Sequence, residues 1–175
     1  ETIKYIENRR ITHKIIIVGE GPERYALQRR LPNAIFTGFL EGDDLAKAYA
    51  SSDIFFNPSQ TETFGNVTLE AMASGLPCVC ANATGSRSLV VNGQNGYLID
   101  PNNVPLYAQA LTEMINNPQH RKLMGKNSHK KSNLYDWDSI LENMIENYRQ
   151  AILNYRESHI NNLTMRKKPT YSYDC

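Results

Sequence analysis

The sequence predicts an α/β fold built on one doubly wound parallel sheet. The main observation is that short apolar runs alternate with helical patterns over residues 1–133. Such alternation produces right-handed βαβ units and hence a parallel sheet. The run from His13 to Val18 is rich in β-branched residues and ends at a glycine, which is typical of a strand buried on both faces. The composition, 41% hydrophobic and 21% charged, is that of a globular protein able to form a core.

The elements follow one another in a regular order, and the opening residues read as the end of a helix. The expected strands are residues 13–18, 34–37, 53–56, 78–81 and 97–99. Three helices are expected between them, at residues 22–30, 43–50 and 66–74. Pro22 suits a first helical turn, and Asp43 and Asp44 suit the positive end of a helix. Gly75 and Pro77 close the third of these helices.

From Val104 to about Ser158 the pattern is helical, with breaks near Pro118 and Asn133. A long final helix begins near Trp137, where apolar residues recur at helical spacing. We expect residues 1–158, this helix included, to form one domain, followed by a flexible tail at residues 159–175. Asp136 and Asp138 form a D-x-D pattern that resembles a metal site, but at a helix start aspartate commonly caps the helix instead. We therefore predict capping.

Composition excludes several classes of protein. The 175 residues contain 19 Lys and Arg against 18 Asp and Glu, so the net charge of +1 argues against nucleic acid as the main partner. Three cysteines are too few for a disulfide framework. The chain opens at Glu1 with no initiator methionine and no apolar signal segment, and we read it as a piece of a longer protein.

Ligands of a parallel sheet bind beyond the carboxyl ends of its strands, where two segments of this chain are candidates. The first, Gly19 to Arg24, begins like a dinucleotide fingerprint but has Arg24 where the third glycine belongs. It can equally be a tight turn between a strand and a helix, although its two glycines leave room for a ligand to approach the backbone.

The second candidate segment, Pro58 to Pro77, contains more groups that could bind a ligand. It places Glu62 in a loop and Glu70 on the second turn of a helix that starts near Asn66. Free N–H groups at the start of a helix favour phosphate, and carboxylates accept hydrogen bonds from the hydroxyls of ribose or sugar. The combination suits a nucleotide that carries a sugar. Alternatively, Glu62 is an ordinary loop charge and Glu70 a surface residue.

This segment resembles the E-x7-E signature of retaining glycosyltransferases of the GT-B fold, a family 4-like group that includes mannosyl-, glucosyl- and sulfoquinovosyltransferases. It reads Glu62-Thr-Phe-Gly-Asn-Val-Thr-Leu-Glu-Ala-Met-Ala-Ser-Gly-Leu-Pro77. Four further matches recur in the family's order: Val18-Gly-Glu-Gly-Pro22, Phe36-Thr-Gly-Phe39, Tyr49-Ala-Ser-Ser-Asp53 and Asn92-Gly-Gln-Asn-Gly96. The resemblance covers residues 13 to about 156, which is the Rossmann-like, donor-binding half of such an enzyme.

The resemblance implies a role for each matching residue. Glu70 would hold the ribose hydroxyls. Glu62 would be the catalytic residue and would contact the transferred sugar. The backbone of Phe64, Gly65 and Asn66 would meet the sugar hydroxyls and phosphate, and Val67 and Thr68 would present N–H groups to the diphosphate. Phe39 and Leu40 would border the nucleobase, and Gly19 would lie beside the donor. The family works without a metal or another cofactor, so none is expected here.

The same resemblance implies that the other Rossmann-like half, which binds the acceptor, is missing from this chain. The parent would transfer a hexose from a UDP- or GDP-sugar to a lipid or glycan, at the cytosolic face of a membrane or in the cytoplasm, and the fragment alone would be inactive. Two alternatives stay open. One is a truncated or degenerate module that binds a nucleotide without transfer, and the other is a dinucleotide-dependent oxidoreductase, which Arg24 disfavours.

Overall fold

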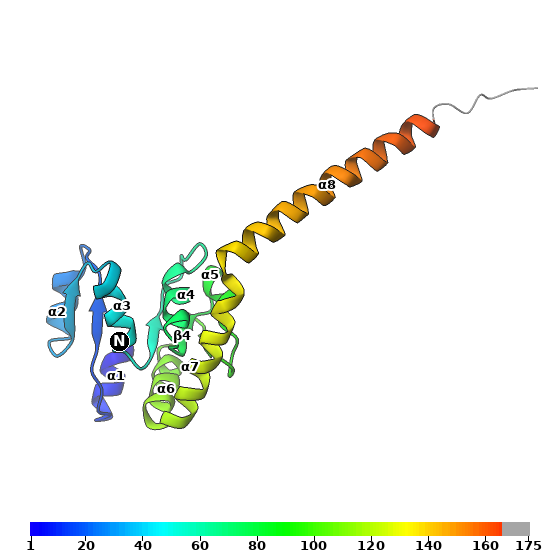
Figure 1. The fold of residues 1–175 in the computed structure, drawn as a ribbon. Helices are drawn as coiled ribbons and strands as arrows, with labels where there is room; N and C mark the ends of the chain where they lie inside the picture. The colour runs from blue at the N-terminus through cyan, green and yellow to red at the C-terminus, as the bar shows by residue number, and fades with distance from the viewer. Residues whose placement is uncertain (166–175) are drawn as a thin grey trace, which may run out of the picture. The chain divides into compact units, whose positions relative to one another are not determined.

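The computed structural model describes residues 1–165 and divides into two compact units (Figure 1). The first unit is Glu1–Asn133, and the second begins at Leu134. All strand pairs in the described part of the chain are parallel, and helices lie between successive strands. The predicted α/β class with parallel strands is therefore confirmed.

Most elements lie within a few residues of their predicted positions. The strands are β1 Ile16–Val18, β2 Ile35–Gly38, β3 Phe55–Asn57, β4 Cys78–Ala81 and β5 Gly96–Ile99. The helices of the first unit are α1 Thr2–Asn8, α2 Arg24–Arg30, α3 Gly42–Ala50, α4 Asn66–Ala73, α5 Thr84–Leu89, α6 Val104–Asn116 and α7 Pro118–Ser132. A 3-10 turn at Asn133–Tyr135 precedes α8, Trp137–Met165. The sequence reading missed α5.

The expected single sheet is instead two sheets. One consists of β1 and β2, and the other has the order β3-β4-β5. The side chains of Ile16 and Val18 on β1 remain 39% and 40% exposed. The prediction that residues 13–18 form a strand buried on both faces is therefore wrong. The β4 strand, by contrast, pairs on both sides and is fully buried.

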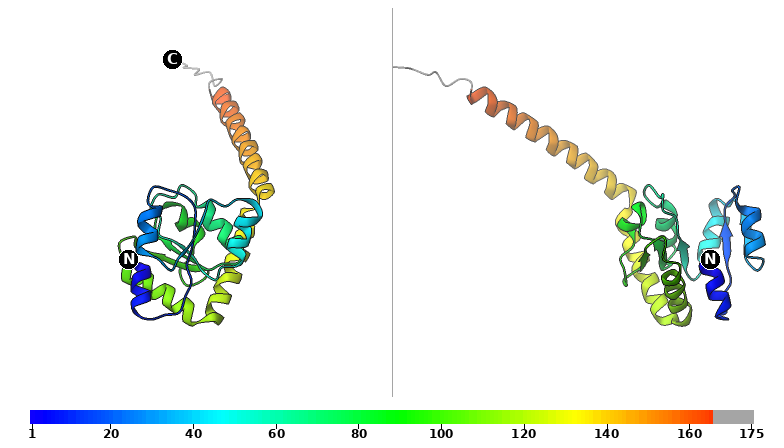
Figure 2. Two further views of the ribbon diagram at one scale, coloured as in Figure 1. Left: turned by 90° about the vertical axis from the view of Figure 1, so that its left-hand side faces the viewer. Right: turned by 180° about the vertical axis from the view of Figure 1, so that it is seen from behind.

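The core of the first unit lies between the β3-β4-β5 sheet and the helices α1 and α6. Val79 and Ile99 from the sheet pack with Ile6 of α1 and Tyr107 of α6. The ring of Phe56 meets Tyr107 edge-on, with ring centroids 5.6 Å apart. The helices α6 and α7 follow one another and are in contact (Figure 2), and α7 also packs against α4. Burial of this kind of apolar surface is the main stabilising contribution to a domain of this size.

The second unit is dominated by α8, an unbroken helix whose start is capped as predicted. Asp136 Oδ2 accepts hydrogen bonds from the backbone N–H and the hydroxyl of Ser139, both at 3.1 Å. An aspartate that accepts from the third helical residue is an N-cap, which gives the D-x-D pattern a structural role. The helix continues to Met165, beyond residue 159, where the sequence pattern predicts the start of the tail. Residues 166–175 lie outside the described residues.

Two further features of the described residues bear on function. None of their helices combines the length and apolarity needed to cross a membrane. Nor do residues 1–165 bring together three or more metal-ligating side chains.

Candidate functional site

The loop between β3 and α4 is shaped by a glycine at its end. Gly65 caps α4 in the left-handed region, with φ of 95°, where a side chain would be strained. A Cβ at Gly65 would also lie 3.2 Å from Leu89 Cδ1. Gly65 therefore lets the loop turn sharply into α4 while it packs against α5.

A second glycine, at the start of α5, allows the backbone of α5 to lie close to the backbone of the loop before α4. A Cβ on Gly85 would lie 2.4 Å from the carbonyl carbon of Phe64, a separation that real Cβ atoms do not adopt. The N–H of Gly85 donates a hydrogen bond to the carbonyl oxygen of Glu62 at 3.0 Å, and the hydroxyl of Thr84 donates to the same oxygen. The loop is thus anchored to the segment that follows β4.

The carboxylate of Glu62 is held from the end of β3. Asn57 Nδ2 donates to Glu62 Oε1 at 3.3 Å, while Asn57 Oδ1 accepts from the Ser59 N–H at 3.1 Å. Glu62 is half-buried. The side chain is therefore directed by a partner at the carboxyl edge of the sheet and is not a free loop charge.

The carboxylate of Glu70 has a partner on α3. The Tyr49 hydroxyl donates to Glu70 Oε2 at 3.0 Å, and it also lies 3.3 Å from the carbonyl oxygen of Val67. Burial, followed by the hydrogen bond to Glu70 and the charge of its carboxylate, raises the pKa of the Tyr49 phenol well above its usual value. The phenol therefore stays protonated, and remains a hydrogen-bond donor, over the whole physiological pH range.

The first turn of α4 offers two unengaged backbone donors. The N–H groups of Thr68 and Leu69 both donate to the Gly65 carbonyl, at 2.9 and 3.0 Å. The N–H groups of Asn66 and Val67 have no acceptor among the described residues. The N–H of Thr68, which the resemblance assigns to the diphosphate, is thus engaged within the turn, and the Thr68 side chain is fully buried. Asn66 and Val67 are the donors that remain for an anion.

The other predicted residues lie at the carboxyl ends of β1 and β2. Gly19 has φ of 125°, its N–H donates to the Gly38 carbonyl at 2.8 Å, and no atom lies within 4 Å of a Cβ placed there. Phe39 follows β2 and is exposed, and Leu40 is half-buried. Within residues 1–165, no hydrogen bond joins this group to Glu62 or Glu70.

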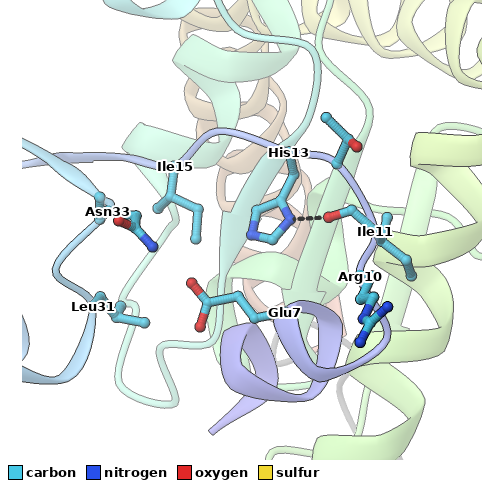
Figure 3. Close-up of a pocket in the computed structure, with 9 residues that line it drawn as sticks. Glu7, Arg10, Ile11, His13, Ile15, Leu31 and Asn33 are labelled. Atoms are coloured by element: carbon cyan, nitrogen blue, oxygen red, sulfur yellow. Dashed lines mark hydrogen bonds between the residues drawn. The ribbon is translucent and has the colours of Figure 1, made fainter.

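A cavity elsewhere in the first unit contains none of the predicted site residues. It has a volume of about 470 Å³ and lies at the amino ends of β1 and β2, where Ile15 and Ala34 precede the strands. In Figure 3 the carboxylate of Glu7 points among the labelled residues, and His13 Nδ1 contacts the Ile11 carbonyl at 2.7 Å. The cavity is thus at the opposite end of the strands from the candidate site.

Sequence reasoning missed the residues that hold the two glutamates: Tyr49, Asn57, Thr84 and Gly85. Asn57 was detectable as a polar residue at the end of a buried strand, where site residues gather. Tyr49 stands at the start of one of the segments quoted for the resemblance, but nothing in the sequence joined it to Glu70. Thr84 and Gly85 lie in α5, which the reading did not expect.

A parallel α/β unit with acidic side chains and free helix N–H groups at its carboxyl edge belongs to the class of nucleotide-binding folds. Comparison with known proteins identifies the family. The model of glycosyl transferases group 1 matches residues 1–131, and the chain belongs to this family.

The curated relatives are longer than this chain. Sulfoquinovosyl transferase SQD2 of Arabidopsis thaliana is 34% identical over 166 residues, which are 91% of this chain and 32% of that protein. A GDP-mannose-dependent alpha-mannosyltransferase of Mycolicibacterium smegmatis is 37% identical over 144 residues, which are 82% of this chain and 37% of that protein. The chain thus spans about a third of the length of these relatives.

Solved structures agree with the fold. Sucrose-phosphate synthase from Thermosynechococcus elongatus matches with a TM-score of 0.75 at 24% identity, over 87% of this chain and 42% of that one. Anabaena Alr3699/HepE in complex with UDP matches with a TM-score of 0.65 at 28% identity, over 77% of this chain and 40% of that one. The neighbours are glycosyltransferases of the GT-B type, so the predicted Rossmann-like fold is confirmed.

Proposed function

We propose that this chain is the donor-binding half of a retaining glycosyltransferase that transfers a hexose from a UDP- or GDP-sugar. The observation that carries the proposal is the start of α4. There, the free N–H groups of Asn66 and Val67 lie between two glutamates whose carboxylates have fixed partners. In this arrangement the N–H groups suit the phosphates, and the two carboxylates suit the hydroxyls of the ribose and the sugar.

The chemistry of glycosyl transfer matches these groups. As the glycosidic bond breaks, negative charge grows on the departing diphosphate and positive charge grows on the sugar. The N–H groups of Asn66 and Val67, at the positive end of α4, stabilise the first of these charges. The carboxylate of Glu62 stabilises the second. Neither contribution requires a metal ion.

The remaining site residues have passive roles in this proposal. The backbone of Phe64 and Gly65 borders the sugar and phosphates, and Gly19 keeps side chains away from the donor. Phe39 and Leu40 border the nucleobase, for which an exposed aromatic ring is a suitable surface. The acceptor is bound by a second Rossmann-like half that this chain does not contain.

The base and sugar are open within this class. The names of the relatives mention GDP-mannose, and those of the solved neighbours mention UDP and UDP-glucose. The binding experiment therefore uses both UDP and GDP. Isothermal titration of the 175-residue chain with UDP and GDP is expected to show weak binding of one of them, and an assay with the matching nucleotide sugar is expected to show no transfer.

Two outcomes would change the proposal. Failure to bind either nucleotide at millimolar concentration would contradict a donor-binding role. Robust transfer by the 175 residues would contradict the assignment of the acceptor site to a second half.

A further inference from the structure

We propose that Tyr49 is a positioning residue that holds the Glu70 carboxylate for the ribose of a bound nucleoside diphosphate. The inference rests on the proposed function, and it assigns a role to a residue on α3, outside the segment that contains both glutamates. Three properties of the contact lead to it: its geometry, the difference in burial between the partners, and the oxygen that it leaves free.

The geometry gives Tyr49 a well-defined place. Its hydroxyl donates to Glu70 Oε2 at 3.0 Å, and its ring lies 6.2 Å from the ring of Phe55, tilted by 52°. The residue is half-buried at the end of α3. The Phe55 ring on β3 and the Val67 carbonyl oxygen on α4, 3.3 Å from the hydroxyl, therefore hold the phenol from two sides.

Glu70, by contrast, is exposed on α4, so its long side chain is free to adopt many rotamers without a partner. A hydrogen bond from a packed phenol to Oε2 removes most of that freedom in advance. Binding that begins from an ordered side chain loses less entropy when the ligand arrives, which raises affinity.

The contact leaves Glu70 able to bind a ligand. The Tyr49 hydroxyl lies 3.0 Å from Oε2 and 3.3 Å from the Val67 carbonyl oxygen, so its contact with the carboxylate is through Oε2 and Oε1 keeps its full capacity as an acceptor. A carboxylate held in this way through one oxygen presents the other to a pair of hydroxyls, such as those on the ribose of a nucleotide. A phenol that remains protonated at physiological pH maintains the contact throughout.

The molecule contains a matched control for this contact. Tyr97 on β5 donates its hydroxyl to Glu113 Oε1 at 2.9 Å, and burial followed by Glu113 raises the pKa of Tyr97 to about 12. This pair joins β5 to α6 and contains none of the site residues. Tyr97→Phe therefore removes the same kind of hydrogen bond, to the same kind of partner, away from the candidate site.

The experiment is a titration cycle on the full 175-residue chain. Wild type, Tyr49→Phe and Tyr97→Phe are each titrated with UDP and GDP, and then with the 2′,3′-dideoxy analogue of whichever nucleotide binds. Tyr49→Phe is expected to weaken binding of the normal nucleotide by about 3- to 10-fold, a typical coupling for one hydrogen bond. With the dideoxy analogue, Tyr49→Phe and wild type are expected to bind equally, because no ribose hydroxyls remain for Glu70 to accept from.

Each other result has a definite meaning. Equal losses with both ligands would show that Tyr49 has only a structural role, and a loss of similar size in Tyr97→Phe would remove the specificity of the effect. An unchanged affinity in Tyr49→Phe would also overturn the inference. Wild type that binds neither UDP nor GDP would instead contradict the proposed function, and the inference with it.

Discussion

One glycine lies in the loop after β1 and another lies against the loop after β3, and their surroundings differ completely. No atom lies within 4 Å of a Cβ placed on Gly21, whereas a Cβ on Gly85, which meets the second loop, would lie 2.4 Å from the Phe64 backbone. Neither residue has a positive φ, so backbone strain does not distinguish them. The glycine after β1 leaves space open, and the one beside the β3 loop allows two segments to pack.

The carboxylates in or beside the two loops differ in the same way. Glu20 forms an ion pair with Arg24, one turn away. Because Glu20 is exposed, this surface pair contributes little to the stability of the fold. Glu62 and Glu70 are instead held by Asn57 and Tyr49, which come from other elements of the fold. The β3 loop is thus organised before a ligand arrives, while the β1 loop has room for one.

Gly85→Ala should have the largest effect. Its Cβ would overlap the Phe64 backbone, which cannot move aside as a flexible side chain would. We expect the free energy of unfolding to fall by about 2–3 kcal/mol, as for other overpacked sites. Urea denaturation measures it, and an unchanged midpoint would contradict the tight packing of this loop.

Glu70→Ala should act on binding and leave stability nearly unchanged, because the side chain is exposed. The loss of charged hydrogen bonds to ribose is expected to weaken nucleoside diphosphate binding by about 1.5–3 kcal/mol. Glu113→Ala, which removes the partner of Tyr97, is the matched control and should bind like wild type. Equal losses in the two variants would argue against a ribose contact at Glu70.

Glu62→Ala should separate the sugar from the nucleotide. Free nucleoside diphosphate lacks the sugar, so its affinity should fall much less than in Glu70→Ala. Where transfer is measurable in a longer protein, kcat should fall more than donor affinity, since the contact strengthens as charge develops on the sugar. Titration and steady-state kinetics test this. The assignment fails if Glu62→Ala weakens free nucleotide as much as Glu70→Ala does.

Gly21→Ala should have the smallest effect on folding. The added methyl group meets no atom, and it restricts the unfolded chain, so stability should rise by about 0.4–1 kcal/mol. Any loss of nucleotide affinity in this stable variant would place the β1 loop beside the ligand. A fall in stability would instead show that the space beside Gly21 is not open.

Local patterns predicted the elements well because each had its own signal. Gly75 and Pro77 marked the end of α4, and the apolar run at β4 was found at its true bounds, Cys78–Ala81. The missed helix, α5, is short and contains Gly85, a poor helix former. Its role depends on contact with Phe64, which no local pattern encodes.

Contacts between residues far apart in the sequence explain the features of the structure that the sequence did not predict. The β-branched run ending at Val18 indicated a strand correctly, but the burial of its two faces depends on which distant elements pack against them and not on composition. Glu62 and Glu70 were visible in the sequence because both lie in the one segment, Pro58 to Pro77, that carries the resemblance. Tyr49 was not, because it reaches Glu70 from a different helix.

The central claim is that a nucleoside diphosphate binds at the start of α4, and amide NMR of the labelled chain during titration with UDP or GDP tests it most directly. The account predicts that the largest shift changes occur at Asn66 and Val67, whose N–H groups are free, with smaller changes at Gly19 and Gly21. Changes confined to the cavity around Glu7 and His13, at the opposite end of the strands (Figure 3), would contradict it.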